Sequence, residues 1–587
     1  MTINGGEIIA KGLRAHGVQY VAGVPGAGIR PLMGELLKPG VGIPFIRVVR
    51  EPSAVHMADG YFRACGRVMA AVLPAHSGIA KAVAALATCV SDSIGAVVIT
   101  GGESADGSYT VPGLVASRAA SPVSENGAAW SKQRLSASEC AELPGLLRLA
   151  FEAASGGRPG PVHLEVPLNV QRESTEAASE SQSFRSTVER LKGDGESIAQ
   201  ALRMLSNAER PLIVAGGGVI SADATLDLLS LAEKLSAPIV TAGNGYGVIP
   251  AEHPLDGGVV GQTGSTCANA LLERADVVLV IGCRLSDLPD VHKRSGHAAK
   301  SPFARMIQID IEQSEIGMRH AVEVGIVADA KSALVDLKEA MPLKVRRAVQ
   351  VRRLDFLEQM RDMRRNWIAV LAERDGTRDN LIRSQRPMIE LRKVLQRDAL
   401  VVVGAGGVQA VAKQSFAVHM PRTYLSSGNR AETGWAVPAS IGAKLAMPAR
   451  QVACIVEDID FLQSMQEIAV CVMHSIPVVY VVYNYSGPAF VQSGADATGS
   501  RSVERDFSLP DGKPYSPAYA EIAKSFGLEA WRVEHASQLA GAFRKALDCS
   551  GAALVEIMIA RDDTGPISDS ATQTANAELL RCNEDAI

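Results

Sequence analysis

The chain has 587 residues and a formal net charge of −4, with 47% hydrophobic residues, 21% charged residues and 54 glycines. This length exceeds what one hydrophobic core supports, and the composition is typical of a globular α/β protein. The small net charge gives no basic field for nucleic acid, and no apolar run reaches the roughly 18–20 residues that cross a bilayer.

The first domain is expected over residues 1–172, where short apolar strands alternate with amphipathic stretches of helix length. The expected elements are strands at 70–73, 96–100 and 161–166 and a helix at about 79–90. The N-terminus lacks the basic and then apolar profile of a signal peptide, so we expect a cytoplasmic protein. Residues 173–193 are polar and predict a linker.

A second domain is expected over residues 194–342 and a third over residues 386–562, with a charged helical stretch from 346 to 374 between them. The expected strands lie at 211–215, 277–281, 306–310, 400–404 and 478–482. Residues 563–587 are polar and predict a flexible tail. Together these patterns predict an α/β fold of three doubly wound parallel-sheet domains.

Nine cysteines are scattered along the chain without a CxxC pair. Most of them lie in apolar surroundings, as Cys89 does. They predict small buried thiols in a reducing compartment rather than zinc sites or disulfides.

Three motifs in this order resemble the thiamine-diphosphate-dependent enzyme family. They are Arg50–Ala64, Arg158–Pro167 and Ser427–Ala443, and the similarity covers roughly residues 5–560. The likeness is greatest to the acetolactate synthase branch, with some likeness to glyoxylate carboligase. It implies a pyrimidine-binding first domain, a nucleotide-binding-like middle domain, and a third domain that binds diphosphate and Mg²⁺.

The resemblance assigns the catalytic role to Glu51, which matches the glutamate that assists the imino tautomer of the cofactor's aminopyrimidine ring. A carboxylate in an apolar cleft has a raised pKa, which suits proton exchange. The alternative is a solvated or helix-capping glutamate after the strand expected at 45–49.

The third domain carries a degenerate form of the family's metal motif, in which a Gly-Asp-Gly is followed by two asparagines. The resemblance implies Asp458, Asn484 and the Gly487 carbonyl as metal ligands. Glu457 replaces a glycine and adds charge beside a polyanion, and Tyr485 replaces the second asparagine. Other cofactor-binding positions implied by the resemblance are Pro25, Gly404, Ala405, Thr433, Ile459 and Asp460.

Further departures from the family occur in positions near the reaction centre. The family's Ser-Gly-Pro-Gly-Ala turn is Ser77–Lys81 here, and its Phe-Gln-Glu motif aligns with Val111–Gly113. Thr433 stands where acetolactate synthases have a bulky apolar residue. We therefore expect substrate handling that differs from acetolactate synthase.

The middle domain has a glycine turn, Ala215–Val219, directly after an expected strand, so its backbone can approach a nucleotide phosphate. The stretches 261–265, 282–287 and 310–317 resemble the branch whose middle domain often carries FAD. The implied nucleotide-binding positions are Gly216, Gly217, Gly264, Arg284 and Asp310. A simple tight turn is the alternative, so FAD stays open.

Two functions remain open. The first is a thiamine-diphosphate- and Mg²⁺-dependent lyase or transferase that decarboxylates or joins a small 2-oxo acid or related carbonyl compound. The second is a paralogue that has lost thiamine, either a FAD-dependent oxidoreductase or a non-catalytic partner subunit. Because the family's cofactor lies between subunits, we expect a homodimer or homotetramer.

Overall fold

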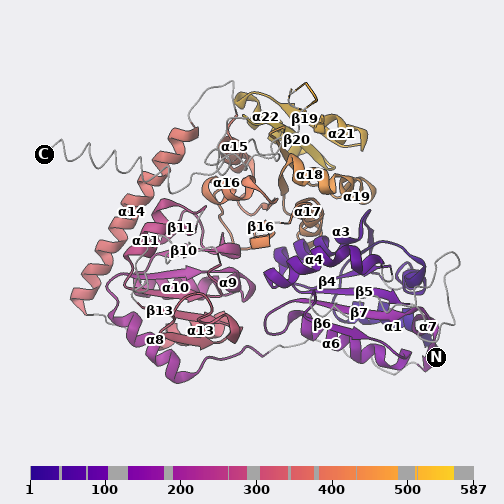
Figure 1. The fold of residues 1–587 in the computed structure, drawn as a ribbon, viewed down its shortest axis with the longest axis horizontal. Coiled ribbons are helices and arrows are strands. Elements are labelled where there is room, and N and C mark those ends of the chain that lie inside the picture. The colour runs from indigo at the N-terminus through magenta and orange to yellow at the C-terminus, as the bar shows by residue number, and fades with distance from the viewer. Residues whose placement is uncertain are drawn as a thin grey trace.

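The computed structural model describes residues 2–38, 42–74, 77–102, 130–176, 189–261, 263–286, 305–341, 346–375, 382–430, 432–486, 509–511, 513 and 515–560. These residues form three six-stranded sheets with every strand pair parallel, each covered by helices (Figure 1). The predicted fold of three doubly wound parallel-sheet domains is confirmed. Among the described residues, no helix has the length and apolar character needed to span a membrane.

The first sheet has the strand order β3-β2-β4-β5-β7-β6. Its strands are β2 (Val21–Gly23), β3 (Phe45–Arg47), β4 (Met69–Leu73), β5 (Ala96–Gly102), β6 (Gln133–Ser136) and β7 (Pro161–Pro167). Its helices are α1 (Gly5–Ala15), α2 (Arg30–Leu36), α3 (Glu51–Cys65), α4 (Ser77–Asp92), α6 (Leu143–Ser155) and α7 (Leu168–Arg172). Part of the expected linker is instead a strand, because β8 (Ser174–Glu176) pairs antiparallel with β1 (Thr2–Asn4).

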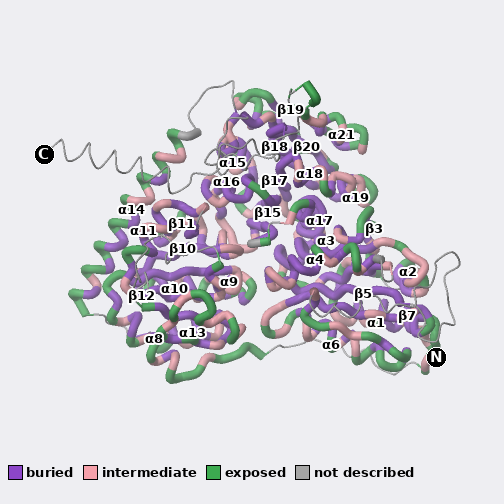
Figure 2. Tube along the Cα trace, viewed as in Figure 1, coloured by how far each residue is buried: buried purple, intermediate pink, exposed green. Residues whose placement is uncertain are grey.

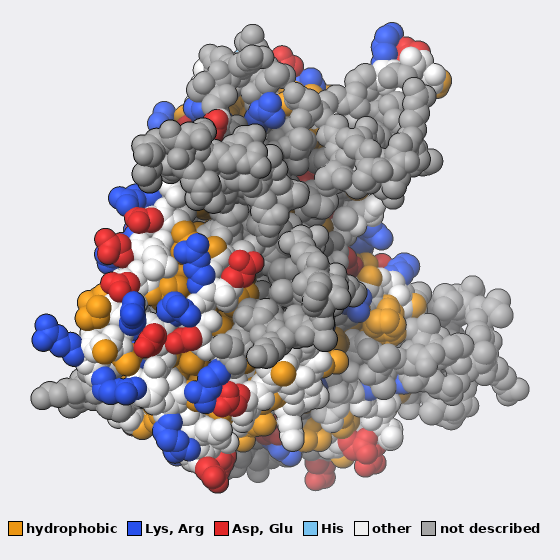
Figure 3. Space-filling view, turned by 60° about the vertical axis from the view of Figure 1, so that its left-hand side comes forward, with side chains coloured by type: hydrophobic (Ala, Val, Ile, Leu, Met, Phe, Trp, Pro, Cys, Tyr) orange, Lys and Arg blue, Asp and Glu red, His pale blue; other side chains and the backbone are white. Residues whose placement is uncertain are grey.

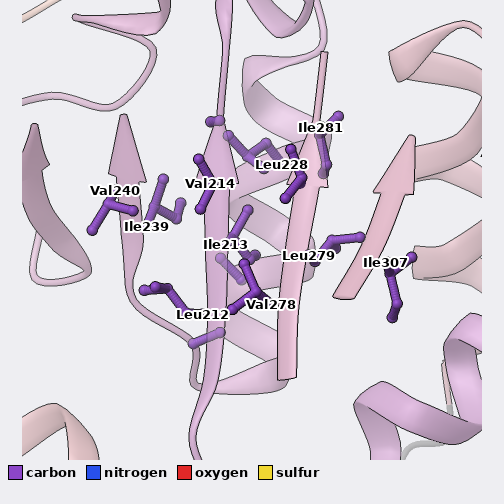
Figure 4. Close-up of a cluster of buried hydrophobic side chains, with 14 of the residues drawn as sticks. Leu212, Ile213, Val214, Leu228, Ile239, Val240, Val278, Leu279, Ile281 and Ile307 are labelled. Carbon is purple, nitrogen blue, oxygen red and sulfur yellow. The ribbon is translucent and has the colours of Figure 1, made fainter. Parts of the chain in front are cut away.

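The middle sheet has the order β11-β10-β9-β12-β13-β14. Its strands are β9 (Pro211–Ala215), β10 (Ile239–Thr241), β11 (Asp256–Val259), β12 (Val277–Ile281), β13 (Met306–Asp310) and β14 (Val324–Val327). The helices are α8 (Gly195–Asn207), α9 (Gly217–Ser221), α10 (Thr225–Leu235), α11 (Thr266–Arg274) and α13 (Ala330–Ala340). Helices cover both faces, so the central strands are continuous apolar runs whose side chains interdigitate in the core (Figure 4).

The third sheet has the order β16-β15-β17-β18-β20-β19. Its strands are β15 (Leu400–Val403), β16 (Tyr424–Ser426), β17 (Val452–Glu457), β18 (Val479–Asn484), β19 (Glu529–Val533) and β20 (Ala553–Met558). The helices are α15 (Gln385–Val394), α16 (Gly407–Ser415), α17 (Ala436–Ala446), α18 (Asp458–Ser464), α19 (Ile468–His474), α21 (Tyr519–Ser525) and α22 (Leu539–Asp548).

Helices α3 and α17 join the first and third domains and are buried almost throughout (Figure 2). Their backbones touch because glycines lie at the crossing. A Cβ on Gly60 would overlap the Ala439 carbonyl, and one on Gly442 would overlap the Met57 carbonyl. This contact fixes α3 relative to the third domain.

The charged stretch forms α14 (Arg347–Asp375), which runs along the outer side of the middle domain. Its Arg353 is fully buried and donates hydrogen bonds to the carbonyls of Leu205, Ala208 and Leu235, at the C-terminal ends of α8 and α10. Basic and acidic side chains intermingle on the face that Figure 3 turns forward.

Candidate active site and nucleotide cavity

The third sheet has a topological switch point between β15 and β17. The two strands are neighbours, with Val403 opposite Ile455, and the chain leaves them toward opposite edges of the sheet. Such points open a crevice at the carboxyl ends of the strands, where ligands bind in open α/β sheets. The predicted positions Gly404 and Ala405 lie here, just before α16.

The Glu457 carboxylate lies at the N-terminus of α16. Glu457 ends β17, and its Oε1 accepts the N–H of Val408 at 2.6 Å. Gly406 has φ +98° and a Cβ there would lie 2.5 Å from Glu457 Oε2, so only glycine leaves room for this carboxylate. Burial raises the pKa of Glu457 to about 8, with the N–H of Val408 opposing that rise. The pattern of sequence motifs did not indicate this contact.

The Asp460 carboxylate takes two further backbone donors at the same place. It accepts the N–H of Ala405 at 3.1 Å and the N–H of Gly434, next to the predicted Thr433, whose side chain is exposed. Burial raises the pKa of Asp460 to about 7, with these two N–H groups opposing that rise. We call the N–H groups of Ala405, Val408 and Gly434 the amide cradle.

The predicted metal ligands follow neighbouring strands. Asp458 begins α18 after β17 and is 1% exposed; Asn484 ends β18, which pairs in parallel with β17. Asp458 Oδ1 accepts the N–H of the predicted Ile459. The Asn484 amide donates to Glu556 at 2.7 Å and accepts from Ser516 Oγ at 2.7 Å.

The other positions of the predicted metal site do not add further acidic ligands. Gly487 lies outside the described residues, and Tyr485 is 6% exposed and packs in the core. Within the described part of the chain, no three His, Cys, Asp or Glu side chains are grouped to hold a metal ion. A cation here would therefore need amide and carbonyl oxygens besides Asp458.

Glu51 is the first residue of α3, and its side chain is largely buried. Its carboxylate pairs with Lys81 Nζ of α4 at 2.7 Å. The segment before it is held by the third domain, since the buried Glu467 carboxylate accepts the N–H groups of Val49 and Arg50. Sequence analysis missed both partners: Lys81 was noted only as a departure from the family, and Glu467 stands in an apolar stretch without a motif.

Two other predicted regions lie apart from these contacts. Pro25 is exposed directly after β2, and residues 111–113 fall outside the described residues. A partly buried group of residues that sequence analysis missed lies beside Thr433: Glu432 accepts a hydrogen bond from Thr88 Oγ1 and lies 3.5 Å from His56 Nε2.

The middle domain has a switch point of the same kind between β9 and β12, and a cavity of about 610 Å³ opens there. It brings together Gly216, Gly217, Arg284 and Asp310, as the resemblance implies. Gly264, by contrast, is not among the lining residues. First-domain and third-domain residues complete the wall, among them Arg63, Asp92, Arg158, Arg422, Tyr424 and Ser426.

The glycines at this switch point have a packing role as well. A Cβ on Gly216 would lie 2.6 Å from Cys283 Cβ, and one on Gly218 would lie 2.7 Å from Gly282 Cα. The turns after β9 and β12 therefore touch only because they lack side chains. The glycine turn is thus a tight packing turn that also borders an open cavity, and nucleotide binding there stays a prediction.

Charged groups of both signs line the cavity. Arg158 pairs with Glu315 at 3.4 Å, and Arg284 donates to the Ser91 carbonyl. Asp310 ends β13, and burial raises its pKa, with the N–H of Glu312 opposing that rise. Arginines suit phosphate groups, and a carboxylate at a strand end suits ribose hydroxyls.

The chain is similar to known proteins over all three domains. Residues 3–117, 198–337 and 404–557 match, in order, the N-terminal TPP binding domain, the central domain and the C-terminal TPP binding domain of thiamine pyrophosphate enzymes. A probable acetolactate synthase large subunit of Methanocaldococcus jannaschii is 30% identical, over 95% of this chain and 92% of the relative. Glyoxylate carboligase of Escherichia coli is 30% identical over 91% and 88%, and an Escherichia coli acetolactate synthase large subunit, isozyme 3, is 28% identical over 93% and 92%.

Proposed function

Because the chain belongs to the thiamine pyrophosphate enzyme family, we propose that it uses thiamine diphosphate to make or break a carbon–carbon bond beside the carbonyl group of a small 2-oxo acid. The relatives named acetolactate synthase and glyoxylate carboligase support this class of reaction. The observation that carries the proposal is Glu51, a buried carboxylate at the first residue of α3 in the motif that resembles the family's catalytic one.

The third-domain switch point fits the cofactor in the kind of groups it presents. Two N–H groups of the amide cradle, those of Ala405 and Val408, lie at the N-terminus of α16, which favours anions such as a diphosphate. Asp458 and Asn484 offer the oxygen ligands that Mg²⁺ prefers. Glu457 and Asp460, however, already accept the cradle's hydrogen bonds. The residues therefore fit the diphosphate on the condition that Glu457 gives up Val408.

When bound, thiamine diphosphate supplies a stabilised carbanion for the reaction. The chain's own residues would bind and orient the cofactor and the substrate. Glu51 holds and releases a proton at its carboxylate, and Lys81 pairs with the charge of that carboxylate. Glu467 fixes the backbone that leads into α3 through two hydrogen bonds, which limits the positions open to Glu51.

We also propose a homodimer or homotetramer. In a single chain, Glu51 and the amide cradle are contributed by different domains, and the family resemblance assigns one site to two subunits. A monomeric and active protein in sedimentation experiments would contradict this assembly.

A second candidate function rests on the middle domain. The 610 Å³ cavity at the β9/β12 switch point, lined by Arg158, Arg284 and Asp310, has the size and groups to take a nucleotide such as FAD. Together with Glu457 on the amide cradle, it favours an oxidoreductase or a partner subunit without thiamine.

The absorption spectrum and extracted cofactors of protein purified with thiamine diphosphate, Mg²⁺ and FAD supplied decide between the two. Retained thiamine diphosphate supports the first function, with or without a flavin. Yellow protein that retains flavin and no thiamine diphosphate supports the second.

A further inference from the structure

The amide cradle is a possible anion site whose N–H donors are already taken by carboxyl groups of the chain. Its helix, α16, has no side-chain cap from Gly406, so the N–H of Val408 has to find another acceptor. Glu457 supplies that acceptor from a strand end 49 residues further along the chain. The carboxylate thus takes the place that a phosphate oxygen would take at a helix N-terminus.

The other groups that the cofactor would contact also have partners within the chain. Glu51 pairs with Lys81, Asp460 bonds Ala405 and Gly434, and the Asn484 amide bonds Glu556 and Ser516. These contacts are an ion pair in the first domain and hydrogen bonds in the third domain. In each of them the polar group has a partner from the chain itself.

Four buried carboxyl groups at this edge of the sheet oppose the entry of a diphosphate. Glu457, Asp458, Asp460 and Glu556 are all at least nine-tenths buried. A diphosphate that entered with Glu457 in place would bring negative charge beside buried carboxyl groups and would lack the Val408 donor. A divalent cation offsets part of that repulsion but supplies no donor.

We propose that Glu457 is an internal competitor of the diphosphate, so that the resting protein has a closed cofactor site that opens only when Glu457 leaves the amide cradle. This inference rests on the proposed function for its physiological ligand. It does not rest on it for its test, because inorganic pyrophosphate carries the same diphosphate chemistry without the thiamine rings.

Titration calorimetry of the full-length protein with inorganic pyrophosphate and Mg²⁺ tests the inference. Glu457→Gly frees the N–H of Val408, and the Kd of this variant for pyrophosphate should be at least tenfold lower than that of the unsubstituted protein. Glu457→Gln keeps the volume of the side chain and an oxygen that can accept the N–H of Val408, so its gain in affinity should be smaller. Glu467→Gln is the matched control, since Glu467 is also a buried carboxylate on two backbone N–H groups, and it should leave the Kd unchanged.

Equal pyrophosphate affinities in the unsubstituted protein and both Glu457 variants, or no binding by any of them, would overturn the inference. If Glu457→Gly does not fold, as judged by thermal unfolding, the Glu457→Gln comparison decides alone. A parallel titration with thiamine diphosphate separates the two proposals. Variants that gain pyrophosphate but not thiamine diphosphate leave the inference standing and refute the proposed function. Tight thiamine diphosphate binding that no Glu457 variant changes does the reverse.

Discussion

The switch points of the middle and third domains have the same topology and different contents. Between β9 and β12, the turns carry Gly216–Gly218 and Gly282, and a cavity of about 610 Å³ remains open. Between β15 and β17, the loop carries Gly404 and Gly406, but Glu457 and Asp460 reach into it and bond its amides. One site is lined for a ligand, and the other is filled by the chain.

The difference shows what a parallel sheet settles and what it leaves to single residues. Strand order places a crevice with free backbone donors at each switch point. The residue at the end of the facing strand then decides whether a side chain of the protein or a ligand accepts hydrogen bonds from those donors. In the middle domain Ile281 is followed by Gly282, whereas β17 ends in Glu457, whose carboxylate is long enough to reach α16.

The largest expected effect lies outside both switch points and asks whether Glu51 takes part in a reaction. Glu51→Gln keeps the size of the side chain but cannot take a proton, so turnover of a small 2-oxo acid should fall about a thousandfold. The melting temperature should change little. Product formation measured beside thermal unfolding checks this. A Glu51→Gln variant with normal turnover would contradict the catalytic role of Glu51.

Replacing Tyr485 with the asparagine that the family has at this position should lower the stability of the protein. The change tests whether the third-domain site is filled by core side chains. Tyr485 is packed in the third-domain core beside Tyr483. Tyr485→Asn supplies an amide oxygen but leaves a cavity, so the free energy of unfolding should fall by about 3 kcal/mol. Denaturant titration measures this. An unchanged unfolding midpoint would show that Tyr485 is not part of the core.

The buried His163, which lies in neither switch point, makes the stability of the whole protein depend on pH. Any comparison of the two switch points at different pH values has to allow for this dependence. Burial lowers the pKa of His163 to about 4, and Thr100 Oγ1 lies 2.8 Å from its Nε2. The unfolded chain takes up the proton first, so stability is full above about pH 6.5 and is lost as the pH falls toward 4. At about pH 5 the loss should be about 2 kcal/mol. The melting temperature of His163→Gln should therefore fall less between about pH 7 and 5 than that of the unsubstituted protein, and parallel curves would contradict the assignment.

The smallest expected effect concerns the open cavity. Asp310→Asn removes the carboxylate at the end of β13, and FAD affinity should fall about tenfold if Asp310 holds a ribose. Asp362→Asn on the exposed face of α14 is the control and should not change it. Fluorescence titration with FAD reports both. Equal affinity in the two variants would place the nucleotide elsewhere.

Much of the architecture was predictable because buried parallel strands are continuous apolar runs. Asp458 and Asn484 were selected by the family resemblance, and the structure places them at the ends of the paired strands β17 and β18. The β8 strand at Ser174–Glu176 was not predictable, because its pairing with β1 depends on backbone groups, while its polar side chains resemble a linker.

The contacts within the third-domain site could not be predicted from the sequence, for a different physical reason. Sequence analysis identified Glu457 as a charge beside a polyanion. Its partner is the N–H of Val408, and no side-chain pattern reveals which backbone amides face a strand end. The Lys81 contact with Glu51 and the Glu467 contacts with Val49 and Arg50 likewise join segments that meet only in the folded chain.

The most direct test of the account is a crystal structure of the protein grown with saturating thiamine diphosphate and Mg²⁺. If Glu457 competes with the diphosphate, the diphosphate should accept the N–H of Val408 in that structure. The Glu457 side chain should have moved away from this N–H. A diphosphate bound at the β15/β17 switch point while Glu457 still accepts the N–H of Val408 would contradict the account.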